Sequence, residues 1–122
     1  MHLRAEQRLR RQDDFRHLRE QGRRIDGGAF ILWWRSRDAA GAVTPPLPVR
    51  VGVVASIAAI GSAVRRNAAK RRLREIFRRN QTLIPPGTDL LLVARPPLNG
   101  LAFHEVESKF IAACQRLTGE KT

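Results

Sequence analysis

The chain has 122 residues, and its 23 Lys and Arg against 11 Asp and Glu give a formal net charge of +12. This length allows one domain with its own core, and we expect a single domain over residues 1–122 with frayed ends at 1–8 and 119–122. No run of about 18 apolar residues occurs, which excludes a membrane-spanning helix, and the lone Cys114 excludes an internal disulfide.

The first elements are predicted from apolar spacing. Residues 9–21 are expected to form a helix, because Phe15 and Leu18 recur near one face. Residues 30–35, which are rich in aromatic and branched side chains, are expected to form a strand. Trp33 and Trp34 then point to opposite faces of that strand. We assign Trp34 to the core and expect the face that carries Trp33 to be open.

The remaining elements follow in order. Residues 38–48, which contain three prolines and a glycine, are expected to form a loop, and 49–55 to form a strand. Residues 88–94 are almost continuously apolar, which is typical of a strand buried on both faces. An apolar stripe predicts a last helix over 102–117. With the helix over 62–80, the order is α-β-β-α-β-α, an α+β fold.

The helix over residues 62–80 organises the chain. Gly61 interrupts what precedes it, Ser62 can cap its first turn, and Pro85 and Pro86 prevent its continuation. Its apolar stripe consists of Ala69, Leu73, Ile76 and Phe77, with Asn80 on the same line. The adjoining arc consists of Arg66, Asn67, Lys70, Arg71, Arg74 and Arg78.

This helix carries eight Arg or Lys and one acid, Glu75. A helix face that only serves solubility usually mixes both signs, because pairs of opposite charge three or four residues apart stabilise it. A row of like charges costs stability unless an anion neutralises it, and arginine suits bidentate contact with phosphate. The arc therefore predicts nucleic-acid binding.

The spaced residues Ala63-Val64-x-Arg66-Asn67-x-x-Lys70-Arg71-x-x-Arg74-Glu75, after Gly61, resemble the signature of the bacterial ribonuclease P protein subunit. The rest of the chain is similar in plan, from about residue 9 to 117. The resemblance implies an additional strand, α-β-β-β-α-β-α, around a central sheet with a left-handed βαβ crossover (a ribosomal protein S5 domain 2-like fold).

The resemblance also implies a function. In that family the RNA subunit holds the Mg²⁺ ions and cleaves the 5′ leader from precursor tRNA, while the protein binds the RNA and the leader and favours Mg²⁺ binding. We expect the RNA-binding residues to be Arg65, Arg66, Asn67, Lys70, Arg71, Arg74 and Arg78. Phe15 and Trp33 correspond to aromatics that line the family's leader-binding cleft, although both could simply be core residues.

Three departures from the family pattern affect binding. Lysines that many members carry before the helix are absent from residues 56–60, Ala68 replaces a basic residue, and Arg19 replaces an aromatic one. We expect either somewhat weaker binding of the leader or the RNA, or compensation by charges such as Arg65 and Arg72.

The protein itself is not expected to be the catalyst. Its histidines (His2, His17 and His104) are scattered, and the adjacent Asp13 and Asp14 diverge on a helix, so no protein metal site or cofactor is predicted. We expect a cytoplasmic location, because the N-terminus lacks the apolar segment of a signal peptide. A ribosomal or general RNA-binding protein is the main alternative. A DNA-binding module is less favoured, because no second helix precedes the basic helix at a short turn.

Overall fold

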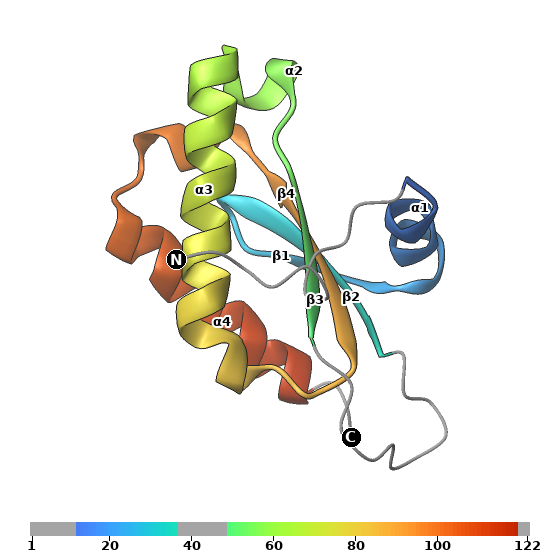
Figure 1. Cartoon of the computed structure of the whole chain (residues 1–122). Helices are drawn as coiled ribbons and strands as arrows, with labels where there is room; N and C mark the ends of the chain where they lie inside the picture. The colour runs from blue at the N-terminus through green and yellow to red at the C-terminus, as the bar shows by residue number, and fades with distance from the viewer. Residues whose placement is uncertain (1–11, 37–48, 120–122) are drawn as a thin grey trace.

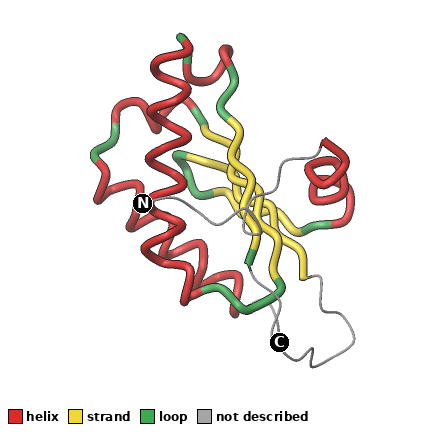
Figure 2. Tube along the Cα trace, in the orientation of Figure 1, coloured by secondary structure: helices red, strands yellow, loops and turns green. Residues whose placement is uncertain are grey.

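The computed structural model describes residues 12–36 and 49–119. A central sheet has helices on both of its faces, as Figures 1 and 2 show. In chain order the elements are α1 (Gln12–Gln21), β1 (Arg23–Asp26), β2 (Phe30–Ser36), β3 (Arg50–Val54), α2 (Ile57–Ile60), α3 (Ala63–Asn80), the 3-10 helix η2 (Gln81–Leu83), β4 (Thr88–Ala94), the 3-10 helix η3 (Pro96–Gly100) and α4 (Phe103–Gly119). This order matches the α-β-β-β-α-β-α plan that the family resemblance implies.

The sheet has four strands in the order β1-β2-β4-β3. β2 pairs antiparallel with β1 and with β4, whereas β3 pairs parallel to β4. The two parallel neighbours are joined through α2 and α3, so this connection is the expected βαβ crossover. The left-handedness of this crossover stays a prediction.

The main core lies between the sheet and the pair α3 and α4, which cover the same face (Figure 1). The stripe residues Ala69, Leu73, Ile76 and Phe77 are all buried there, as predicted. Trp34 is only 5% exposed and belongs to this core, which confirms its assignment. Cys114 is buried in it too, and burial raises the pKa of its thiol to about 12.

The other face of the sheet is not open, contrary to the expectation. α1 packs across β2 and β4, and its Leu18 meets Leu91 in a smaller cluster. Phe15 and Trp33 are half-buried against this cluster, together with Val54 and Val93. Trp33 lies directly opposite Leu91 in the strand register, so the tryptophan and α1 share one apolar patch.

The residue pattern missed β1 and α2. β1 has one buried residue, Ile25, between exposed charged neighbours, and it pairs with β2 at one edge of the sheet. β4 has the bounds that the apolar run predicted, and α4 extends two residues beyond the expected 117. The predicted loop over 38–48 and the predicted fraying of 1–8 fall outside the described residues.

Candidate nucleic-acid interface

The start of α3 is fixed by two local features. The Ser62 side chain accepts a hydrogen bond from the backbone N–H of Arg65 at 3.3 Å, which satisfies a donor of the first turn. Gly61 has a φ of 112°, in the left-handed region that favours glycine. The chain can therefore turn sharply out of α2, and the first turn of α3 presents its cations at a defined angle.

The predicted arc lies along the β3 edge of the sheet. α3 contacts β3, which is an edge strand, while η3 and α4 contact the opposite flank of the helix through Arg72 and Arg79. The arc residues Asn67, Arg71 and Arg74 are exposed, and Arg66 and Lys70 are half-buried. The structure thus brings the five family-matched residues together on one accessible strip.

Arg66 has one unusual atom. Its Nε is buried and has no hydrogen-bond partner within the described part of the chain. An unsatisfied buried donor costs roughly 1–3 kcal/mol, so an acceptor that reached this nitrogen would stabilise the side chain. A guanidinium that meets a phosphate or carboxylate in a bidentate manner uses such a nitrogen.

Arg78 is engaged within the protein. Its Nε donates to a carboxylate oxygen of Glu75 at 3.0 Å, and a second nitrogen contacts the other oxygen. The hydrogen bond from Arg78 lowers the pKa of Glu75, and the same bond raises the pKa of Arg78. The one acid of the helix therefore neutralises Arg78, and the accessible strip consists of the residues before it.

The opposite flank of α3 carries Arg65, Arg72 and Arg79, spaced seven residues apart. Arg72 Nη1 donates to the backbone carbonyl oxygens of Leu98 at 3.4 Å and Leu101 at 2.8 Å. It was expected to compensate for missing RNA contacts, but η3 occupies one of its nitrogens. Helical spacing alone does not predict which flank of α3 packs within the protein and which stays accessible, because this depends on the elements that pack beside each flank.

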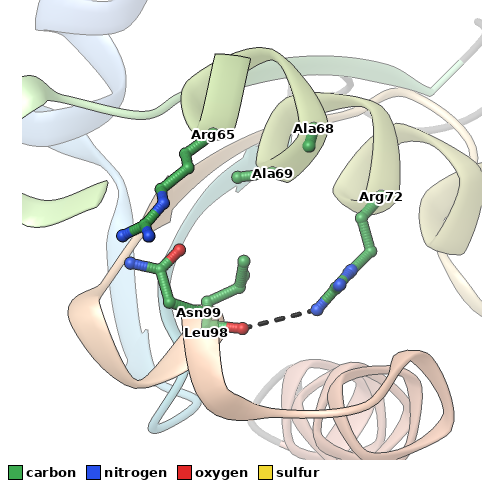
Figure 3. A pocket seen from close by; sticks show the side chains of 6 residues that line it. All are labelled: Arg65, Ala68, Ala69, Arg72, Leu98 and Asn99. Atoms are coloured by element: carbon green, nitrogen blue, oxygen red, sulfur yellow. Dashed lines mark hydrogen bonds between the residues drawn. The ribbon is translucent and has the colours of Figure 1, made fainter. Parts of the chain in front are cut away.

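Arg79 and Arg65, at the two ends of this flank, differ in their surroundings. Arg79 lies over the ring of Phe103, 5.2 Å from its centroid, and its Nε is 3.4 Å from a carboxylate oxygen of Glu107. Arg65 is exposed and lines a pocket with Arg72 and Asn99 (Figure 3). Arg65 therefore does not belong to the same strip as Arg66 and Arg74.

An ion pair lies at one end of the sheet face that α1 covers, which we call the α1 face. Arg50 on β3 donates to both carboxylate oxygens of Asp89 on β4, at 2.9 and 2.8 Å. The Asp89 side chain is only 7% exposed. Sequence reasoning missed this pair, although a lone Asp inside the apolar run over 88–94 signals a buried partner.

The segment before α3 supplies no cations. Residues 57–60 form α2, and the Ser56 side chain accepts a hydrogen bond from Ala59 N at 3.1 Å. Ile57 is 69% exposed at the position where the family resemblance suggests lysines. Val64 at the start of α3 is 79% exposed. This tip is therefore apolar, and the cations begin at Arg65.

The part of the chain that the structure describes holds no group of three or more His, Cys, Asp or Glu residues arranged to bind a metal ion. In the same residues, no helix combines the length and apolar character needed to cross a membrane.

Comparisons with known proteins agree with this geometry. The family model described as Ribonuclease P matches residues 3–118. The chain is 37% identical over 121 residues to the ribonuclease P protein component of Streptomyces avermitilis, with 96% of each chain covered. It is 31% identical over 117 residues to that of Thermotoga maritima, with 93% of each covered.

Solved structures show the same fold. The RNase P protein from Thermotoga maritima matches with a TM-score of 0.75 and 30% identity, over 89% of this chain and 96% of that one. A Staphylococcus aureus RNase P protein matches with a TM-score of 0.73 and 20% identity, over 92% and 94%. The matched motif, the fold and the relatives agree, and the chain belongs to the bacterial ribonuclease P protein family, whose members are the protein component of a ribonucleoprotein endonuclease.

Proposed function

We propose that this chain binds the catalytic RNA of ribonuclease P through the strip of Arg66, Asn67, Lys70, Arg71 and Arg74, and binds the 5′ leader of precursor tRNA through Phe15 and Trp33. The observation that carries the proposal is the placement of a cationic strip at the β3 edge, next to an apolar, aromatic patch on the α1 face. One RNA strand crossing that edge would meet both surfaces.

The strip suits a phosphate backbone for electrostatic reasons. Four of its five residues are Arg or Lys, and Glu75, the one acid of α3, contacts Arg78. Each phosphate neutralised by a cation releases counterions, which gives an affinity that falls steeply with salt. A phosphate that reached Arg66 Nε would also supply an acceptor, which this nitrogen lacks among the described residues.

The aromatic patch suits unpaired bases. Phe15 and Trp33 are half-buried, so their rings combine a fixed position with some accessible surface. Val54 belongs to the same cluster and extends it from β2 and β4 onto β3, which is the strand at the cationic edge. Stacking of bases on aromatic rings contributes roughly 1–3 kcal/mol per base and tolerates many sequences.

The protein acts here as an electrostatic partner and not as a nuclease. Its charge of +12 lowers the repulsion between the catalytic RNA and the precursor tRNA. It also leaves the Mg²⁺ ions to the RNA, whose sites fill more readily when the two RNAs are held together. We infer a cytoplasmic site of action, where precursor tRNA is made.

The direct test is cleavage of a precursor tRNA at low Mg²⁺ by the ribonuclease P RNA of Streptomyces avermitilis, with and without the chain. An RNA mutant that cannot cleave is the control. Strong stimulation that disappears with the inactive RNA supports the proposal. Cleavage with the inactive RNA, or no stimulation with several bacterial RNAs, would overturn it.

Single variants then locate the RNA surface. Arg66→Ala and Arg74→Ala should each weaken RNA binding and lower cleavage at low Mg²⁺ while the chain stays folded. Arg116→Ala is the matched control, because it removes the same charge from an exposed position on α4. Equal affinities for all three variants would show that the strip is not the RNA surface.

A further inference from the structure

We propose that the pocket between α3 and η3 is a second phosphate site, which holds one backbone phosphate of an RNA strand on the flank of α3 opposite the strip. This inference rests on the proposed function, since it assumes that RNA is the partner. The pocket has a volume of about 310 Å³ and is lined by Arg65, Ala68, Ala69, Arg72, Leu98 and Asn99.

The pocket gathers polar groups from two elements. Figure 3 shows Arg65 and Arg72, two turns apart on α3 with Ala68 and Ala69 between them, extending toward the segment that carries Leu98 and Asn99. The Asn99 amide nitrogen donates to the backbone oxygen of Ile60 at 3.2 Å, which ties η3 to the end of α2. This bond fixes η3, which forms one wall, against α2, and the bonds from Arg72 to Leu98 and Leu101 fix the same segment against α3, which forms the other wall.

The pocket is electrostatically prepared for an anion. None of its six lining residues is acidic, and two are arginines. Arg72 is held in place because its Nη1 donates to the backbone oxygens of Leu98 and Leu101. Those bonds use one of its three nitrogens, and Arg65 is exposed. A guanidinium fixed in this way loses little further freedom when it binds a phosphate.

Small lining residues leave space in the pocket for a phosphate. Ala68 is exposed between the two arginines, one turn of helix from each, and its methyl group leaves the space between them empty. A longer side chain at this position would fill the pocket. Leu98 and Ala69 supply a buried apolar floor, against which the sugar next to a bound phosphate can pack.

This pocket is distinct from the strip. At 100° per residue, Arg65 and Arg72 lie roughly 140–180° around the helix axis from Lys70 and Arg74. The core stripe separates the two surfaces on the sheet side. A single helix would therefore contact RNA on both flanks, as a ridge that inserts between two segments of the folded catalytic RNA or between that RNA and the precursor tRNA.

The decisive substitution is Ala68→Glu, with Ala68→Gln as its matched neutral control. Glutamate at 68 lies three residues after Arg65 and four before Arg72, so it should pair with both and stabilise the helix slightly. It would occupy the phosphate position at the same time. We expect Ala68→Glu to bind the Streptomyces avermitilis RNA about tenfold more weakly than Ala68→Gln, the effect of one charge-assisted contact, with no loss of thermal stability.

A second measurement checks the charge itself. Arg65→Gln should lower the slope of log affinity against log salt by about one unit, whereas Arg116→Gln, an exposed α4 variant, should leave the slope unchanged. Binding is measured with the catalytic RNA alone and with its complex with precursor tRNA. A loss in the first arm assigns the phosphate to the catalytic RNA, and a loss in the second arm alone assigns it to the precursor tRNA.

The two proposals fail separately. If Arg74→Ala weakens RNA binding while Ala68→Glu and Ala68→Gln bind equally well in both arms, the pocket is not a phosphate site and the proposed function stands. If the wild-type chain neither binds nor stimulates the RNA, the proposed function itself is wrong.

Discussion

Substitutions of the two adjacent tryptophans of β2 should separate stability from leader binding. Trp34 is 5% exposed in the main core, with Arg23 5.9 Å from its ring centroid. Trp34→Leu loses that contact and part of a fully packed ring, so we expect a cost of about 3 kcal/mol in unfolding free energy. Trp33 is half-buried beside Leu91, its partner on the neighbouring strand, and a leucine at 33 would still contact it, so Trp33→Leu should cost about 1 kcal/mol.

For leader binding we expect the opposite order, with Trp33→Leu more damaging than Trp34→Leu. If one leader base stacks on Trp33, Trp33→Leu removes about 1–3 kcal/mol, or roughly tenfold in affinity, from substrates that carry a leader. Trp34→Leu should leave this increment unchanged. The assay compares the affinity of the reconstituted holoenzyme for precursor tRNA with its affinity for mature tRNA. Urea unfolding of each variant gives the stability scale.

The refuting result is specific. If Trp33→Leu weakens precursor and mature tRNA equally, Trp33 is a packing residue and the leader lies elsewhere. Trp33→Phe provides a further check, because phenylalanine keeps a stacking ring and should restore most of the leader-dependent increment.

Three further outcomes follow from charge and burial. Glu75→Gln removes the carboxylate that Arg78 contacts and adds one net positive charge to α3, so it should steepen the salt dependence of RNA binding by about one unit; an unchanged slope contradicts this. Asp89→Asn leaves Arg50 without its carboxylate and should cost about 3 kcal/mol in urea unfolding; a loss below about 1 kcal/mol would show that the pair is dispensable. The pKa of Cys114 is raised to about 12, so iodoacetamide at pH 8 should label the native chain far more slowly than the unfolded one, and stability should fall as pH rises from 9 toward 12; equal labelling rates would show an accessible thiol.

Strong local signals predicted the elements that carry them. The apolar run after Asp89 predicted β4 with both of its ends, because five consecutive apolar residues bounded by Arg95 and Pro96 are typical of a strand buried on both faces. The glycine and serine before α3 predicted its start, and its stripe predicted its buried face. The candidate strip was predicted from the same helix, because one face packs on the core and the row of cations beside it favours an anionic partner, and its contact with RNA stays a prediction.

Features that depend on distant neighbours could not be predicted in this way. β1 is held by pairing with β2 and has only Ile25 as an apolar signal. The cover of α1 over Trp33 depends on the path of the chain around the sheet edge. Arg72 and Arg74 are two residues apart and chemically identical, yet η3 and α4 pack on the flank of the first and leave the second exposed.

The central place of β4 has a consequence for synthesis of the chain. The β1–β2 hairpin and β3 do not pair with each other, and each joins the sheet through β4. Until residues 88–94 leave the ribosome, two apolar strand edges and the finished α3 are present without the strand that unites them. Nascent chains that stall before β4 should therefore expose edges prone to aggregation, and the sheet should form late and in one cooperative step.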